Sequence, residues 1–405
     1  MAKQRADLTF KYNLKQGRHG WLRLTPAYSI KIVRQILEKH RGITYVLDPF
    51  SGTGTTGLVC AENNTRCDLI DINPFLVWFA RVKTSNYEIE HLQEVQRGLD
   101  DICEYVVHYD GTTGLWFPPI HNITRWWSMS RLAILGKIYQ ALDRQSTLSP
   151  PATDLLKVAF CSLIINWSNA AFNHQSMSFK ETLTGQLTFL DEEQQILDQF
   201  SETVQRLIAV ARIPLRGRVK VIQADSRNIP FPVESTYDCV ITSPPYPNRM
   251  SYIRELRPYM YWLGYLKNGR EAGELDWQAI GGTWGIATSR LQTWQPSGGR
   301  LPYSGFDKII AEISEQSPSL ASYVHKYFED MLMHIKSLYL VLSSGAKVFY
   351  VVGNSRFYDT LVPTERICAN FLEACGFADT NVQLIRKRNS KKELFEFIVS
   401  AKKLD

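Results

Sequence analysis

The chain has 405 residues, of which 44% are hydrophobic and 21% charged, and its formal net charge is +6. This composition excludes a disordered or fibrous chain, and no apolar run approaches the roughly 20 residues of a membrane helix. The seven cysteines include no C-x-x-C pair and no cluster with metal spacing. We therefore expect a cytoplasmic protein with reduced thiols, no metal and no membrane anchor.

The first part of the chain predicts a β-turn-α-β unit. Thr25-Pro26 marks a helix start, because apolar residues follow it at helical spacing. Residues 43–47 form a short apolar strand, the Gly-rich turn "DPFSGTGTTG" follows, and the next strand ends at Asp71. This order opens a doubly wound, Rossmann-like α/β sheet.

The rest of the chain divides by its periodicity. Residues 85–216 show helical periodicity and hardly any strand pattern, whereas "RVKVIQADSRNIP" and "YDCVITSPPY" predict two further strands. Residues 251–322 are rich in Trp, Gly and Arg, and we expect them to be too polar and turn-rich for a core. A helix, a strand, a second helix and an antiparallel pair of strands then complete a mostly parallel sheet.

These segments predict one α/β domain that is interrupted by two insertions. The predicted divisions are 1–84, an N-terminal arm and first half; 85–216, a helical insertion; 217–250, a catalytic half; 251–322, a second, loop-rich insertion; and 323–405, the C-terminal part of the domain. Either insertion is a candidate for recognition of the target.

The Gly-rich turn predicts a ligand site. Gly52 and Gly54 let the backbone approach a ligand at the carboxyl end of a strand. The Asp71 carboxylate, about 20 residues further on, can accept hydrogen bonds from ribose hydroxyls. Asp48 and Asp71 together favour an adenosine-type ligand with a neutral or cationic group, while a purely structural turn is the alternative. The turn is not a triphosphate loop, because no Gly-Lys-Ser/Thr follows it.

The third strand ends at Asp225-Ser226, beside the expected adenosine pocket. A carboxylate in this position can accept a hydrogen bond from an adenine amino group. The alternative is that Asp225 caps the turn before Pro230.

The fourth strand ends in the corner Ser243-Pro244-Pro245-Tyr246. The prolines fix φ and remove two N–H donors, which leaves hydroxyl and carbonyl acceptors on a stiff backbone. Tyr246 adds an aromatic plane on which a base can stack. Such a corner suits a planar group that carries an NH₂, although a structural Pro-Pro turn is the alternative.

Taken together, "DPFSGTGTT" and "TSPPY" resemble the S-adenosylmethionine-dependent DNA methyltransferases that modify exocyclic amines, and most of all those that modify cytosine N4. The resemblance covers residues 20–84, 217–250 and 323–405. It implies a cofactor, S-adenosyl-L-methionine, and direct in-line transfer of its methyl group to a base flipped out of duplex DNA. The implied cofactor-binding residues are Thr25, Pro26, Asp48, Phe50, Ser51, Gly52, Thr53, Gly54, Asp71, Asp225 and Ser226. Ser243, Pro244, Pro245 and Tyr246 are the implied catalytic residues.

Basic and polar residues near the corner predict contacts with double-stranded DNA. Asn248, Arg249 and Arg254 follow the corner directly, and "RKRNSKKELFEFIV", which contains Arg388 and Lys391, resembles the family's late hairpin. A solvated charged surface is the alternative for each of them.

The leading hypothesis is a site-specific cytosine-N4 DNA methyltransferase of a restriction–modification system, with a cognate restriction endonuclease as candidate partner. An adenine-N6 DNA methyltransferase is the first alternative, because one residue of the corner separates the two. A methyltransferase for RNA or protein glutamine, and a non-catalytic nucleic-acid-binding protein of this fold, are further alternatives. A cytosine-C5 mechanism lacks a nucleophile, since the chain has no Pro-Cys dipeptide.

Overall fold

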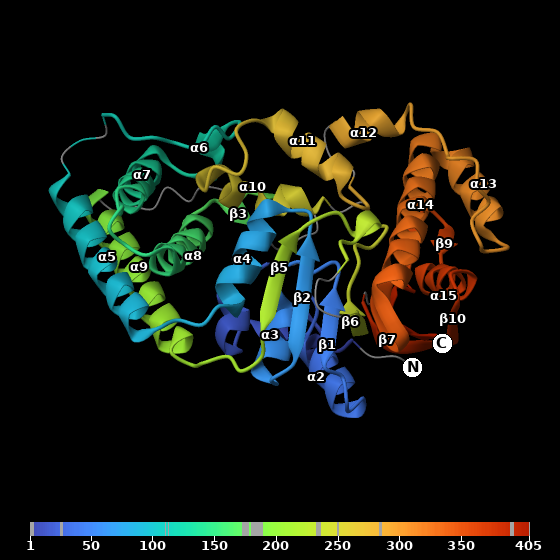
Figure 1. The fold of residues 1–405 in the computed structure, drawn as a ribbon. Helices are drawn as coiled ribbons and strands as arrows, with labels where there is room; N and C mark the ends of the chain where they lie inside the picture. Colours follow the sequence, from blue (N-terminus) through green and yellow to red (C-terminus); the bar gives the residue numbers. More distant parts are fainter. Residues whose placement is uncertain are drawn as a thin grey trace.

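A computed structural model describes residues 4–24, 27–109, 111, 113–171, 178–179, 189–231, 236–248, 251–282, 286–388 and 393–404. Within these residues, a central sheet of seven strands separates two layers of helices, and a helical block stands beside it (Figure 1). From one edge to the other the strands are β10 (Phe377–Lys387), β11 (Phe395–Lys403), β7 (Leu342–Gly353), β6 (Tyr237–Thr242), β1 (Tyr45–Asp48), β2 (Arg66–Asp71) and β5 (Val219–Gln223).

The sheet confirms the predicted fold class. The strands from β7 to β5 pair in parallel, and β11 pairs antiparallel with both β7 and β10. All four residues of β1 are buried, as expected for a parallel strand covered on both faces. Tyr45 and Leu47 face one helix layer, and Val46 faces the other.

Each face of the sheet has its own helices. The layer behind Val46 contains α2 (Ile30–Lys39), α3 (Thr55–Glu62) and α4 (Pro74–Thr84). The opposite layer contains α13 (Phe306–Gln316), α14 (Pro318–Val341) and α15 (Thr364–Ala374). Polar caps begin several of them: the Asn73 side chain accepts a hydrogen bond from the Phe75 N–H (3.0 Å), and Ser317 precedes Pro318 at the first position of α14.

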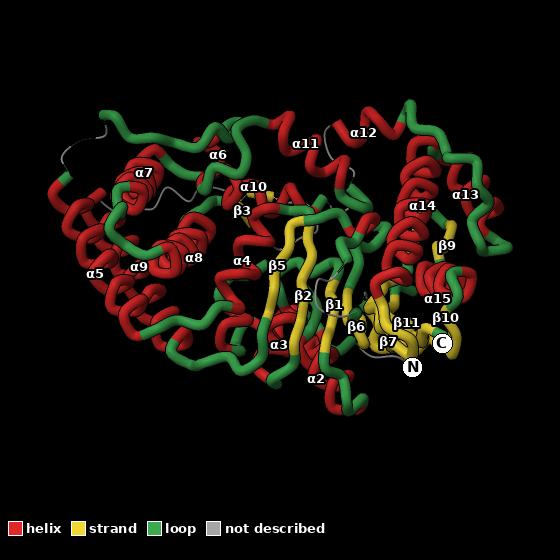
Figure 2. Tube along the Cα trace, viewed as in Figure 1, coloured by secondary structure: helices red, strands yellow, loops and turns green. Residues whose placement is uncertain are grey.

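Residues 85–216, the predicted helical insertion, are mostly helix where they are described (Figure 2). Its helices are α5 (Ile89–His108), α6 (Ile123–Trp126), α7 (Met129–Asp143), α8 (Pro150–Asn166) and α9 (Phe189–Ala211), with the two-residue strands β3 (Ala170–Ala171) and β4 (Ser178–Phe179). Smaller elements elsewhere are η1 (Ala6–Leu8), α1 (Phe10–Asn13), η2 (Gly17–Gly20), η3 (Ser226–Asn228), β8 (Ser355–Phe357) and β9 (Thr360–Val362).

The expectation that residues 251–322 are too polar for a core is wrong for α10 (Tyr252–Trp262). Tyr259, Met260 and Trp262 are buried in the same apolar cluster as helices α5 to α9 and α4. The Trp262 ring lies 5.3 Å from that of Phe160 and 6.0 Å from that of Trp127, both measured between ring centroids. The two insertions of the sequence therefore share one core, in which α10 packs against α4. After α10 come α11 (Gly269–Gln278) and α12 (Ile286–Leu291).

Figure 1 shows α10 and α11 above the arrowheads of β5 and β2, at the edge where the parallel strands end. In an open α/β sheet this is the edge at which ligands bind.

Candidate active site

The Gly-rich turn (residues 49–54) is bound to the end of the neighbouring strand β2. Gly52 and Gly54 have positive φ of 49° and 74°, which glycine adopts without strain. The Gly52 N–H donates to Asp71 Oδ2 (2.9 Å), so the turn and the acid are fixed relative to each other. A Cβ on Gly54 would lie 2.9 Å from the Ala80 Cβ, so close packing on α4 also requires glycine there.

Asp71 presents its carboxylate to a pocket at this edge. Its other oxygen, Oδ1, accepts the Asn73 N–H (2.9 Å), so each oxygen retains capacity for a further donor. Burial raises the pKa of Asp71 to about 7. Nearby, the buried Ser51 hydroxyl lines the same pocket and has no hydrogen-bond partner among the described residues.

Asp48, although predicted to bind cofactor, lies beneath the turn and does not line the pocket. It is fully buried and accepts hydrogen bonds from the Thr242 hydroxyl (2.6 Å), the Phe50 N–H (3.1 Å) and the Thr56 hydroxyl. Burial raises its pKa to about 6. Asp48 thus ties the turn to β6 and fixes the shape of the turn.

Thr53 and Gly54, also predicted to contact cofactor, face the protein interior and do not line the pocket. The fully buried Lys83 donates from Nζ to the Thr53 carbonyl (2.7 Å). Burial lowers the pKa of Lys83 to about 7. The turn is therefore supported from below by an amine that the sequence pattern did not single out.

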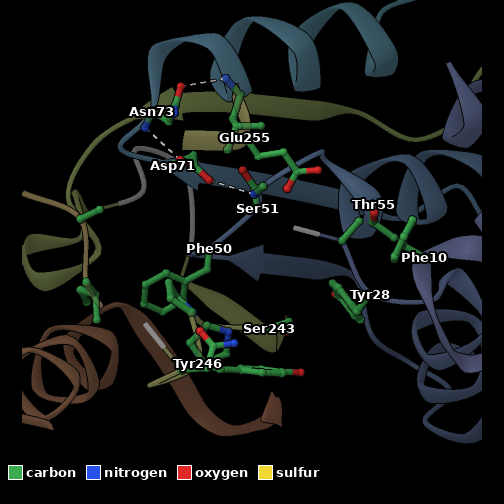
Figure 3. A pocket seen from close by; sticks show the side chains of 18 of the residues that line it. Phe10, Tyr28, Phe50, Ser51, Thr55, Asp71, Asn73, Ser243, Tyr246 and Glu255 are labelled. Atoms are coloured by element: carbon green, nitrogen blue, oxygen red, sulfur yellow. Dashed lines mark hydrogen bonds between the residues drawn. The ribbon is translucent and has the colours of Figure 1, made fainter. Parts of the chain in front are cut away.

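The pocket has a volume of about 650 Å³, within the range of small-molecule sites. It joins the Gly-rich turn, the Ser-Pro-Pro-Tyr corner, the N-terminal arm (residues 4–24), α10 and the β10–β11 hairpin (Figure 3). Of the predicted residues it is lined by Phe50, Ser51, Gly52, Asp71, Asp225, Ser226, Ser243, Pro244, Pro245, Tyr246, Asn248, Arg254 and Arg388. The positions Thr25, Pro26, Arg249 and Lys391 lie outside the described residues.

Hydrogen bonds to two elements, β7 and α14, hold the Ser243 side chain and the backbone of the corner. The Ser243 hydroxyl donates to the Val351 carbonyl of β7 (3.1 Å), which leaves its lone pairs as acceptors. The Tyr327 hydroxyl of α14 donates to the Pro245 carbonyl (2.7 Å). The corner therefore combines a fixed backbone with an oriented hydroxyl.

Tyr246 is fixed by the C-terminal hairpin. Its hydroxyl donates to Glu396 Oε1 (3.0 Å), a buried carboxylate that also pairs with Arg386 (2.7 Å). Burial, followed by the charge of Glu396, raises the pKa of Tyr246 well above its usual value. Arg388 places its Cζ 5.2 Å from the centroid of the Tyr246 ring.

Asp225 lines the pocket but already holds a strong partner. Arg227 donates to its carboxylate from Nε (3.0 Å) and Nη2 (2.7 Å), and reaches Asp330 at 2.9 Å through Nη1. The predicted cap is also present, because Asp225 Oδ1 accepts the Arg227 N–H (2.9 Å). Hence an adenine amine would share this carboxylate with Arg227.

Phe50 and Ser226 line the pocket, and both contact the buried His334, which does not belong to the lining. The His334 Nδ1–H donates to the Ser226 carbonyl (2.9 Å), and its Nε2 accepts from the Tyr350 hydroxyl (2.7 Å). Burial lowers the pKa of His334 to about 4, so the ring is neutral near pH 7. The Phe50 ring meets the imidazole edge-on at 4.6 Å between centroids.

Several lining residues were not assigned to the site from the sequence: Leu8, Phe10, Lys11, Arg23, Tyr28, Glu255 and Asp276. Arg386 and Glu396 lie in the segment that was assigned to the late hairpin, but neither was singled out. Glu396 had a usable signal, because it is a lone acid between two phenylalanines of an apolar strand. The others come from segments whose position depends on tertiary packing. None of the helices in the described ranges combines the length and apolar character of a membrane span, and these ranges contain no metal-type cluster of His, Cys, Asp and Glu.

No protein-family model matches the chain. Over 96% of its length it is 20% identical to the Type II methyltransferase M.AvaI of Nostoc sp., covering 86% of that protein. Over 96% of its length it is also 21% identical to the Type II methyltransferase M.BsoBI of Geobacillus stearothermophilus, covering 85% of that protein. A match to the Type II methyltransferase M.MjaII of Methanocaldococcus jannaschii is 35% identical over 66 residues, which are 16% of this chain and 12% of that one. The chain is thus similar, over nearly its whole length, to Type II methyltransferases.

Proposed function

We propose that the protein is a site-specific DNA methyltransferase that transfers the methyl group of S-adenosylmethionine to the exocyclic N4 amine of a cytosine flipped out of duplex DNA. The observation that carries this proposal is the shared pocket, in which Asp71 and the Gly-rich turn face the Ser-Pro-Pro-Tyr corner. The similarity to Type II methyltransferases supports a role in a restriction–modification system, with a cognate endonuclease as partner.

The residues of the pocket fit S-adenosylmethionine. The Asp71 carboxylate can accept both ribose hydroxyls, and the orphaned Ser51 hydroxyl offers a hydrogen bond at the turn. Phe50, which packs against the neutral His334, gives the pocket an apolar wall, and Asp225 belongs to the same lining. When bound, S-adenosylmethionine supplies a methyl group that is electrophilic because its sulfur carries a positive charge.

The corner supplies what an attacking amine requires. Ser243, whose hydrogen is directed to Val351, can accept a hydrogen bond from the amine and so orient the nitrogen lone pair. The fixed backbone and hydroxyl provide preorganised acceptors for the positive charge that develops on the nitrogen. Tyr246 offers a plane for the base, although its ring is shared with Arg388.

The cysteines support direct transfer over a covalent route. All seven lie among the described residues, and none of them lines the pocket. Burial raises the pKa of the Cys239 thiol, which lies in the strand that ends at the corner, well above its usual value. None of the cysteines is therefore a candidate for the thiolate nucleophile that attack on cytosine C5 requires.

The test is methylation of duplex DNA by the purified protein with labelled S-adenosylmethionine, followed by nucleoside analysis. We expect N4-methylcytosine, and loss of label in the Ser243→Ala and Asp71→Ala variants. If the product is N6-methyladenine instead, the target base is adenine and not cytosine. Label in RNA but not in DNA would refute the proposal, and sequencing of the methylated DNA would give the recognition site.

A further inference from the structure

Glu255 of α10 is an acidic residue that lines the pocket but belongs neither to the Gly-rich turn nor to the Ser-Pro-Pro-Tyr corner. It lines the pocket together with Ser51, Gly52 and Thr55. Figure 3 shows its side chain directed from α10 over the Gly-rich turn, above Ser51 and toward Thr55. This is a third region of the pocket, separate from Asp71 with its ribose acceptors and from the corner with Tyr246.

Cations from the N-terminal arm line the same pocket. Lys11 and Arg23 belong to its lining, as do Phe10 and Tyr28 of the arm and of the segment that follows it. Arg23 and Glu255 both act on the same buried phenol: the charge of Glu255 raises the pKa of Tyr259, and that of Arg23 lowers it, after the larger effect of burial. One negative side chain from α10 and two positive ones from the N-terminal arm thus line the same pocket.

The position of Glu255 is set by a helix that is anchored at both ends. Ser251 caps α10 by accepting the Arg254 N–H (3.2 Å), and its hydroxyl donates to the buried Asp276 (2.9 Å). At its other end α10 is anchored by Trp262 in the core of the helical block. An acid in the first turn also stabilises the helix dipole, and this simpler role has to be separated from ligand binding by experiment.

We propose that Glu255 binds the α-ammonium group of the cofactor's amino-acid end and that Lys11 and Arg23 face its α-carboxylate. This inference rests on the proposed function, since it concerns the ligand of the same pocket. An ammonium and a carboxylate on one carbon match the paired charges of this region, and a charge-assisted hydrogen bond to a carboxylate is the strongest contact available to an ammonium. The second insertion would then contribute directly to cofactor affinity.

Calorimetric binding of three ligands tests the proposal without any methyl transfer. S-adenosylhomocysteine carries both charges, decarboxylated S-adenosylmethionine keeps the amine, and methylthioadenosine lacks the whole amino-acid end. We expect Glu255→Gln to lower the affinity for the first two ligands by about tenfold or more. The affinity for methylthioadenosine should fall by less than about twofold. Lys11→Ala and Arg23→Ala should lower the affinity for S-adenosylhomocysteine and leave the affinity for methylthioadenosine unchanged.

Glu271 provides the matched control. It is the first-turn acid of α11 and accepts the Lys267 N–H (2.7 Å), but it does not line the pocket. Glu271→Gln should leave all three affinities unchanged. The proposal is overturned if Glu255→Gln lowers the affinity for methylthioadenosine as much as that for S-adenosylhomocysteine, or if it lowers neither affinity. A wild-type protein that binds none of the three would overturn the assignment of the cofactor, and this inference with it.

Discussion

The guanidinium of Arg388 lies over the ring of Tyr246, with Cζ 5.2 Å from the ring centroid. Its Nη2 donates to the Asn354 carbonyl (2.8 Å), while its buried Nε has no partner among the described residues. A Cβ on Gly353 would lie 2.3 Å from Arg388 Nη1 and 3.0 Å from Tyr246 Cδ2, so the glycine is needed for this arrangement. A base that stacks on the covered face of Tyr246 must therefore displace Arg388.

Removal of the guanidinium should make that displacement unnecessary. A cation–π contact contributes about 0.5–2 kcal/mol, so we expect Arg388→Ala to bind free deoxycytidine about two- to thirtyfold more tightly. Competition binding with the nucleoside measures this in the absence of phosphate contacts. Lys387→Ala, one residue earlier, is the control. Weaker nucleoside binding by Arg388→Ala would show instead that the guanidinium contacts the base directly.

The roles of the Tyr246 ring and of its hydroxyl can be tested separately. Tyr246→Phe keeps the ring and removes one donor from the buried Glu396, which Arg386 still pairs. We expect this variant to lose about 1–3 kcal/mol of stability and less than about tenfold in turnover, whereas Tyr246→Ala should lose about a hundredfold or more. Methyl transfer at saturating DNA and chemical unfolding provide the two readouts. Equal loss of turnover in both variants would assign the role to the hydroxyl.

Asp71 predicts a pH dependence of cofactor binding. Ribose hydroxyls donate hydrogen bonds and so favour the charged carboxylate, and burial raises the pKa of Asp71 to about 7 in the unliganded protein. Affinity for S-adenosylhomocysteine should therefore fall below pH 7, by at most about tenfold per pH unit, and be constant above it. Asp71→Asn should bind more weakly at pH 8 and show no such slope. The same slope in Asp71→Asn would assign the titration to another group.

The burial of Trp262 in the shared core predicts how strongly the two insertions stabilise each other. The side chain is fully buried among Trp127, Tyr139 and Phe160. Trp262→Ala should cost about 3–5 kcal/mol of unfolding free energy, measured by urea denaturation. The control is Trp116→Ala: Trp116 contacts Trp262 edge-on at 5.9 Å but is 43% exposed, and its loss should cost less than about 2 kcal/mol. Similar costs for the two variants would contradict a shared core centred on Trp262.

The turn and the corner could be predicted because their structure follows from local rules. Glycines and prolines restrict the backbone at their own positions, and the ends of parallel strands meet at one edge of the sheet. Ser243 and Asp71 could thus be expected in one pocket from the sequence. The fold class followed from the same alternation of strands and helices.

Other features depend on contacts between distant segments. Whether Asp48 faces a ligand or the core is decided by Thr56 and Thr242, which lie on other elements. The helix α10 contains Pro258, a residue that ordinarily interrupts a helix, and its aromatic residues pack against helices more distant in the chain. A pattern read along the chain therefore assigned this segment to loops.

The order of the strands has a consequence for synthesis. β11 lies between β7 and β10, so β10 is attached to the sheet only through a strand that follows it in the chain. Until β11 has been made and inserted, Arg386 and Arg388 have no fixed position and Tyr246 lacks Glu396. A ribosome-bound chain without these residues would therefore have an incomplete Ser-Pro-Pro-Tyr corner, and the methyl transfer that we propose would begin only after β11 has joined the sheet.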